Sequence, residues 1–189
     1  MAVVTSASAG LRAAPKATVI QLRAPDLSTA ALEREARKLV ASASVPVVIS
    51  SRCDVALASG AAGVNLPERD VSVADARKLL GELLVGRSVH SIEGALRAEA
   101  EDADFVIFGP VWESASHPDL KPAGLSALEA VARATGIPVL AIGGVTAERV
   151  DRCLAAGAGG YAAIGLFTSP PRGEGPGEAW GGEPGVTLP

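Results

Sequence analysis

The stretch Ile137-Pro-Val-Leu-Ala-Ile-Gly-Gly-Val-Thr146, followed after a short helical segment by Gly159-Gly-Tyr-Ala-Ala-Ile-Gly165, decides the fold of this chain. Each segment is an apolar, strand-like run that ends in glycine, where the chain must turn into a helix or a loop. The bare N–H groups of such a turn, next to a helix N-terminus, can hold an oxyanion such as a phosphate without any side chain. Glycine also makes tight strand-to-helix turns in many folds, so the turn alone leaves both explanations open.

The rest of the chain repeats the same pattern of a strand followed by a helix. Eight strands are predicted, several of them continuous apolar runs that are typical of a parallel sheet buried on both faces. They span residues 2–5, 18–23, 46–50, 63–66, 86–90, 104–108, 138–142 and 161–164. Eight strands that alternate with helices favour a closed (β/α)8 barrel, the TIM-barrel fold of the α/β class, over a doubly wound sheet.

Helix ends are marked by capping residues. Helices are predicted over 29–42, 73–84, 92–101, 127–135 and 147–156, each preceded by a serine or threonine that can cap it: Ser28, Ser72, Ser91, Ser126 and Thr146. Gly60, Gly136 and Gly157 stand where glycines commonly end helices.

The two ends of the chain depart from this pattern. Between Thr5 and Thr18 there is room only for a reduced first helix, a single turn or none. One side of the barrel would then be exposed, and a second copy of the chain could bury it as a homodimer. We expect one compact barrel domain over residues 1–168 and a disordered Gly/Pro-rich tail over residues 169–189.

The composition excludes several classes of protein. The 189 residues are 48% hydrophobic but only 3% aromatic, which predicts one domain with an aliphatic core. The net charge of −4 argues against a nucleic-acid-binding surface. No apolar run is long enough to span a membrane, and residues 1–10 lack the features of a signal peptide. Cys53 and Cys153 have no clustered histidine, which favours reduced, buried thiols in a cytoplasmic protein.

In a TIM barrel the active site collects at the C-terminal ends of the strands. Gln21 and Arg23 alternate along one strand and so share a face, and the guanidinium of Arg23 offers a planar fork for an anion. Ser88 and His90 share a face in the same way, although no third group is evident to orient them as a nucleophilic pair.

Charged residues also follow two other strands. Glu68 and Asp70 could bind a divalent cation, although an acidic residue at this place is more often a helix cap. Arg52 and Asp54 are explained equally well as a charge pair that starts a helix.

The segment 109–124 is the longest and most polar loop, and long loops in small domains are usually functional or disordered. Its three prolines and Trp112 indicate a shaped flap. Its polar side chains are Glu113, Ser114, Ser116, His117, Asp119 and Lys121. His117 is the natural acid/base candidate, because the reference pKa of histidine lies at about 6.5.

Taken in order, these motifs resemble the thiamine phosphate synthase and thiazole tautomerase (TenI) family over residues 2–167. The matching segments are Val4-Thr5, Gln21-Leu-Arg23, Gly63-Val-Asn65-Leu with Asp70 beyond it, Gly86-Arg-Ser88-Val-His90, Gly109-Pro-Val-Trp112-Glu-Ser114-Ala-Ser116-His117 and Ala141-Ile-Gly143-Gly144-Val-Thr146. The resemblance implies a thiazole phosphate held at the last two strands, with other substrate contacts from the remaining motifs. The residues implied for the phosphate are Gly143, Gly144, Ile164 and Gly165. Those implied for the other substrate contacts are Gln21, Arg23, Ser88, Ser114 and Ser116.

Several positions depart from the family pattern. The Asn-Asp pair that in the synthases helps to bind pyrimidine diphosphate and Mg²⁺ is Ser50-Ser51 here. A serine hydroxyl is a poor replacement for a carboxylate on a hard cation. Two lysines of the family are replaced by Pro25 and His117. Cations are therefore missing where a diphosphate would leave, and stabilising that charge is most of such a reaction's catalysis. Lys121 or Arg52 could substitute if the loop folds back.

These departures favour a divergent thiazole tautomerase that needs no metal. Gly143, Gly144 and Gly165 would hold the phosphate, Arg23 a carboxylate, and His117, with Glu113 in reserve, would move the proton. The first alternative is thiamine phosphate synthase itself, which joins hydroxymethylpyrimidine diphosphate to thiazole phosphate and releases diphosphate, with Mg²⁺ at Asp70. The second is a non-catalytic barrel that binds thiazole or thiamine phosphates and acts through a partner. Other phosphate-handling barrels rank last, because the chain lacks their paired carboxylates.

Overall fold

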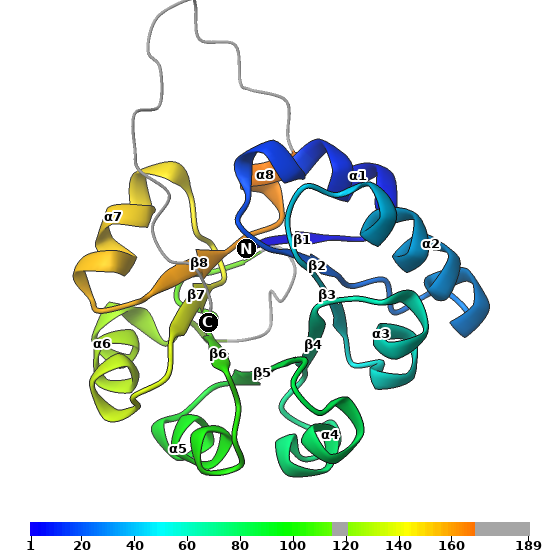
Figure 1. Ribbon diagram of the computed structural model, residues 1–189. Coiled ribbons are helices and arrows are strands. Elements are labelled where there is room, and N and C mark those ends of the chain that lie inside the picture. Colours follow the sequence, from blue (N-terminus) through cyan, green and yellow to red (C-terminus); the bar gives the residue numbers. More distant parts are fainter. Residues whose placement is uncertain (115–120, 169–189) are drawn as a thin grey trace, which may run out of the picture.

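Eight parallel strands form a closed ring in the computed structural model, which describes residues 1–114 and 121–168 (Figure 1). The strands are β1 (Ala2–Val4), β2 (Ile20–Leu22), β3 (Val47–Ser50), β4 (Gly63–Leu66), β5 (Leu84–Val89), β6 (Phe105–Phe108), β7 (Val139–Ile142) and β8 (Gly160–Ala162). Each strand pairs with the next one in the sequence, and a bridge between Ala2 and Ala163 joins β1 to the end of β8. The TIM barrel and all eight predicted strands are confirmed.

Helices surround this ring on the outside (Figure 1). They are α1 (Ala7–Ala13), α2 (Thr29–Ser42), α3 (Cys53–Ser59), α4 (Val73–Leu80), α5 (Ile92–Ala100), α6 (Gly124–Ala134), α7 (Ala147–Ala155) and α8 (Gly165–Thr168), with a 3-10 turn at Ala14–Lys16. Ser28, Ser72 and Ser91 cap their helices as predicted. The Oγ atom of each accepts a backbone N–H of the first turn, at 3.3, 3.0 and 3.1 Å respectively.

Two predicted helix ends are wrong. Helix α4 ends at Leu80 rather than at residue 84, because Gly81 has a φ of 57° and the chain then enters β5. Helix α6 begins at Gly124, before Ser126, because Ala123 and Gly124 donate backbone hydrogen bonds to the carbonyls of Pro110 and Val111. Gly136 directly follows Thr135, the C-cap of α6, as predicted, and its N–H donates to Glu99 at 2.9 Å.

Gly60 and Gly157 do follow helices in the left-handed conformation, as predicted, with φ of 70° and 85°.

The first helix is short, as expected, but it is not reduced to one turn. Ser6 begins α1 directly after β1, and its hydroxyl accepts the N–H of Ala9. Helix α1 packs closely on α2 because Gly10 has no side chain there: a Cβ atom would lie 2.6 Å from Leu39 Cδ1. This side of the barrel is therefore covered, which removes the structural reason for expecting a homodimer.

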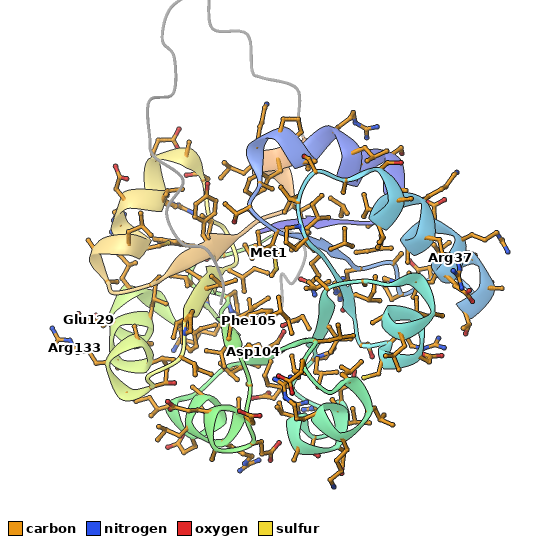
Figure 2. The ribbon with its side chains drawn as sticks, in the orientation of Figure 1. Met1, Arg37, Asp104, Phe105, Glu129 and Arg133 are labelled. Atoms are coloured by element: carbon orange, nitrogen blue, oxygen red, sulfur yellow. The ribbon has the colours of Figure 1, made fainter. Side chains whose placement is uncertain are left out.

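The core has two layers. The larger layer lies between the outer faces of the strands and the helices, and the smaller one fills the barrel itself. Phe105 and Met1 point toward the centre, whereas Arg37 and Arg133 lie at the outer rim (Figure 2). A side chain at Gly86 would overlap the ring of Phe105, so this glycine makes room for Phe105 in the barrel interior.

Other predictions concern the cysteines, membrane spans and the tail. Both cysteines are free. Cys153 is buried, as predicted, while Cys53 is only half-buried. Among the described residues, no helix is both long and apolar enough to cross a membrane. The predicted tail, 169–189, lies outside the described residues.

Candidate functional site

The C-terminal half of the barrel interior is polar on one side. Gln21 pairs in register with Val3 and Val48, which both belong to the interior core, so its side chain also faces inward. Ser50 lies two residues beyond Val48 and pairs with Asn65, which places both on the same inner face. Ser88 pairs in register with Ile107 of the same interior core. Strands β2 to β5 thus each place one polar side chain inside the barrel, namely Gln21, Ser50, Asn65 and Ser88, and we call these four residues the polar layer.

Asn65 is the most constrained member of this polar layer. Its side chain is 3% exposed, and its Nδ2 donates to Ser88 Oγ at 3.0 Å. Its Oδ1 is buried and has no hydrogen-bond partner among the described residues. A buried amide oxygen without a partner is unfavourable by about 1–3 kcal/mol. Such a group therefore indicates a place where a ligand can supply the missing donor.

The opposite side of the barrel mouth, the end at which the strands finish, is built from backbone atoms. Val111 and Trp112, in the loop after β6, donate N–H groups to the carbonyls of Ile142 and Gly143. A Cβ at Gly143 would lie 2.5 Å from Pro110, and one at Gly144 would lie 2.5 Å from the carbonyl oxygen of Glu113. Both glycines also have positive φ, 92° and 63°. The Gly-Gly turn is therefore required by the close packing of two loops as well as by its own conformation.

The same turn leaves donors for an anion. Neither Gly143 nor Gly144 donates its N–H to another described residue. Thr146 begins α7 without a side-chain cap, whereas Ser28, Ser72 and Ser91 each cap their helices. These N–H groups stand at the N-terminus of a nine-residue helix, where an anion is favoured.

A pair of arginines on α7 supports the turn from outside. The guanidinium of Arg149 lies 5.0 Å from the Trp112 ring centroid, and that of Arg152 lies 5.9 Å from it. Arg149 also donates to the carbonyl of Gly144 at 2.7 Å. The tryptophan thus joins the loop after β6 to α7 and holds the Gly-Gly turn between them.

Ser51 and Asp70 meet at the rim beside β3 and β4. The Ser51 hydroxyl donates to Asp70 Oδ2, and the N–H of Val71 donates to Oδ1 at 2.8 Å. Cys53 lies close by. Its burial, followed by the charge of Asp70, raises the pKa of the thiol, which therefore stays protonated at neutral pH.

The residues present do not fit the Mg²⁺ site that the resemblance implies. In the described part of the chain, no group of three or more His, Cys, Asp or Glu side chains is placed to share a metal ion. Asp70 supplies one carboxylate, and both of its oxygens already accept hydrogen bonds from the protein. Where the synthases have the second carboxylate there is only the Ser51 hydroxyl, a weak ligand for a hard cation.

His90 is oriented by two neighbours, which the sequence did not indicate. Its Nδ1 is hydrogen-bonded to the carbonyl of Gly109 after β6, and its Nε2 lies 3.9 Å from a carboxylate oxygen of Glu68 after β4. Because a carbonyl only accepts, Nδ1 carries a proton. His90 thus bridges the loops on both sides of β5.

The remaining predicted residues are distributed around the mouth. Arg23 is exposed just beyond β2, and its side chain makes no hydrogen bond or ion pair with any described residue. Ile164 is 44% exposed between β8 and α8, which begins at Gly165. Glu113 is exposed and Ser114 is half-buried. Ser116 and His117 lie outside the described residues.

Arg52, the N-cap residue of α3, is hydrogen-bonded to two neighbours. It donates to both carboxylate oxygens of Asp54 and to Thr29 Oγ1. This arrangement supports the interpretation of Arg52 and Asp54 as a charge pair at the start of a helix.

Two inward-facing residues, Ser50 and Asn65, were not predicted as site residues. Ser50 enters the sequence analysis only as a departure from the family pattern, and Asn65 only as part of a matching segment. The alternation of side chains along a strand, which identified Gln21 and Ser88, would have found both, because each is the last or the last but one residue of its strand.

Comparisons with known proteins agree with this fold. The sequence model of a family described as "Thiamine monophosphate synthase" matches residues 2–167. A protein from Aquifex aeolicus named "Putative thiamine-phosphate synthase 2" is 38% identical over 152 residues, which cover 79% of this chain and 82% of that one. A "Thiamine-phosphate synthase" from Methanoculleus marisnigri is 41% identical over 163 residues, covering 82% and 76%.

A solved structure gives the same result. Thiamine phosphate pyrophosphorylase from Pyrococcus furiosus superimposes with a TM-score of 0.79 at 29% identity, covering 87% of this chain and 82% of that one. The family match spans nearly all of the barrel, and its motifs lie at the strand ends that form the mouth. The chain therefore belongs to the thiamine monophosphate synthase family.

Proposed function

We propose that this chain catalyses the thiamine phosphate synthase reaction, joining a pyrimidine diphosphate to a thiazole phosphate. The observation that carries the proposal is the division of the mouth into two halves that suit two different ligands. Strands β6 to β8 offer the backbone N–H groups of Gly143 and Gly144, which have no acceptor among the described residues, whereas β2 to β5 offer the polar layer. The names of the relatives support this reaction over the tautomerase that the sequence analysis preferred.

In this reaction the bond between the methylene carbon of the pyrimidine and the diphosphate oxygen breaks, and its electron pair leaves with the diphosphate. The thiazole nitrogen supplies the pair for the new carbon–nitrogen bond, so no net proton transfer is needed. The Gly-Gly turn would hold the thiazole phosphate, with Gly165 and Ile164 beside it. The orphaned Oδ1 of Asn65 and the hydroxyl of Ser88 would bind donor and acceptor groups of the pyrimidine ring.

The departing diphosphate needs positive charge, and Arg23 is the described cation best placed to supply it. It follows Gln21 by two residues at the end of β2 and has no other described partner. Lys121 stands in the loop after β6 and is also exposed. In the same loop we propose Ser114 and Ser116 as substrate-binding residues. His117 and Glu113 are the proposed acid/base residues.

The loss of the second carboxylate at Ser51 favours one competing function, the metal-free thiazole tautomerase. That reaction moves a proton on a thiazole carboxylate phosphate, which Arg23 and the Gly-Gly turn could bind together. His117 was proposed for the proton, and the oriented imidazole of His90 is a second group of the right kind. The same residues would serve a non-catalytic protein that binds thiazole or thiamine phosphates.

One assay separates these functions. The purified full chain is supplied with hydroxymethylpyrimidine diphosphate and thiazole phosphate, with and without Mg²⁺, and thiamine phosphate is measured by fluorescence after oxidation. Product that depends on both substrates supports the synthase. The Gly144→Ala variant should abolish turnover, and Gly60→Ala, a glycine of similar φ far from the mouth, should retain it. Isomerisation of a thiazole carboxylate phosphate without condensation would overturn the proposal in favour of the tautomerase. Binding of both ligands without turnover would overturn it in favour of a binding protein.

A further inference from the structure

Ser51 has a backbone conformation that suits a different residue. Its φ of 70° lies in the left-handed region, which aspartate and asparagine adopt more readily than most other residues. Its N–H donates to the carbonyl of Asn65 at 3.0 Å, which fixes the position of the backbone. The side chain at position 51 is thereby aimed at Asp70, whose Oδ2 accepts the Ser51 hydroxyl.

The other acidic and polar groups nearby do not replace the missing carboxylate. Glu68, which shares the loop with Asp70, lies toward Nε2 of His90. Asp54 is engaged by Arg52. Within the described residues, Asp70 is the carboxylate to which the Ser51 hydroxyl is hydrogen-bonded.

We propose that Ser51 sets the metal dependence of this site: a hydroxyl in hydrogen bond with Asp70 takes the place of a carboxylate pair, so the chain by itself binds divalent cations weakly. Proteins usually hold Mg²⁺ through one or two carboxylates together with substrate phosphates. Two carboxylates at the distance of a hydrogen-bonded pair repel one another unless a proton or a cation lies between them. Ser51→Asp should therefore create a cation site where the wild type has a hydrogen bond.

This inference depends on the proposed function in one respect only. The proposed function makes the diphosphate the ligand beside Ser51 and Asp70. Its test is made without substrate, so the two can fail separately. A chain that makes no thiamine phosphate would contradict the proposed function and leave the metal result as it stands.

The experiment titrates Mn²⁺ into the full-length wild type, Ser51→Asp and Ser51→Asn, and measures free Mn²⁺ by electron paramagnetic resonance. Asparagine suits the same φ and adds no charge, so it is the matched control. We expect Ser51→Asp to bind Mn²⁺ at least about tenfold more tightly than the wild type, and Ser51→Asn to match the wild type. Without metal, Ser51→Asp should melt at a lower temperature than Ser51→Asn, and Mg²⁺ should restore it.

Two results would overturn the proposal. One is a wild type that binds Mn²⁺ as tightly as Ser51→Asp, and the other is an equal gain in Ser51→Asn. If Ser51→Asp does not fold, Asp70→Asn replaces it in the comparison. A Mn²⁺ affinity of Asp70→Asn close to that of the wild type supports the inference, whereas a loss of more than about tenfold shows a working metal site and refutes it.

Discussion

The two halves of the barrel mouth have changed to different extents. The half formed by β6 to β8 retains the family's Gly-Pro-Val and Gly-Gly motifs. Its geometry depends on them, since a Cβ atom at Gly143 or Gly144 would overlap Pro110 or Glu113 of the loop after β6. The half formed by β2 to β5 has Ser51 where the resemblance to the family implies an aspartate. Here the side chains contact one another by hydrogen bonds rather than by close backbone packing.

The difference follows from how each half binds. A site made of backbone N–H groups cannot change by substitution without disturbing the fold, because the same glycines allow the loops to approach. A site made of side chains can exchange a charge for a hydroxyl and keep its fold. Substitutions in the first half should therefore reduce stability and function together, and substitutions in the second half should separate them.

The largest effect is expected from Gly144→Ala. The added Cβ would meet the Glu113 carbonyl and Trp112, and the residue would keep a φ of 63°. Strain and overpacking together should lower the free energy of unfolding by about 2–5 kcal/mol. Turnover should be lost. Urea denaturation measures the stability, with Gly60→Ala as control, for which strain alone predicts about 1–2 kcal/mol and unchanged activity. Equal losses in both variants would contradict the role of loop packing.

Asn65→Leu should separate stability from function. It removes a buried amide whose Oδ1 has no partner in residues 1–114 and 121–168, so the free energy of unfolding should stay within about 1 kcal/mol of the wild type or rise. Its kcat/KM should fall by about tenfold or more, equivalent to about 1.4 kcal/mol. Ser88→Ala is the companion variant. It leaves Nδ2 of Asn65 unpaired as well, and should destabilise by about 1–3 kcal/mol. An Asn65→Leu protein that is fully active would place the ligand elsewhere.

Arg149→Met tests the support beneath the Gly-Gly turn. Methionine keeps an apolar contact with Trp112 but loses the hydrogen bond to the Gly144 carbonyl. We expect a loss of stability of about 1 kcal/mol. The KM for the thiazole phosphate should rise several-fold at nearly constant kcat. Arg152→Met, which lies farther from the ring and has no bond to the turn, should change both quantities less. The reverse order would show that Arg152 carries the support.

The smallest effect is expected from Arg52→Gln, at the rim of the half formed by β2 to β5. Arg52 pairs with an Asp54 that is 61% exposed, so stability at pH 7 should change by less than about 1 kcal/mol. The hydrogen bond from Arg52 lowers the pKa of Asp54 below its ordinary value of 3.8. Any stabilisation from the Arg52–Asp54 pair is thus present above the ordinary pKa of 3.8. It is lost as the pH falls through the lowered pKa of Asp54. Loss of diphosphate binding in this variant would show that Arg52 leaves Asp54 to bind the substrate.

Local patterns in the sequence determined the barrel. Strand periodicity, serine caps and the Gly-Gly turn are short-range features, and they predicted eight strands and three capped helices that the structure contains. The same patterns failed where distant segments intervene. Gly10 lets α1 pack on α2, and Pro110 and Val111 fix the start of α6.

Only the tertiary structure decided the partners within the site. Ser51 and Asp70 are 19 residues apart, Asn65 and Ser88 are 23 apart, and His90 is oriented by residues from two other loops. A residue's spacing along a strand shows which face it occupies, but not which side chain stands beside it. That neighbour depends on how the barrel closes, and so determines whether Asp70 accepts a hydroxyl or is left to bind a cation.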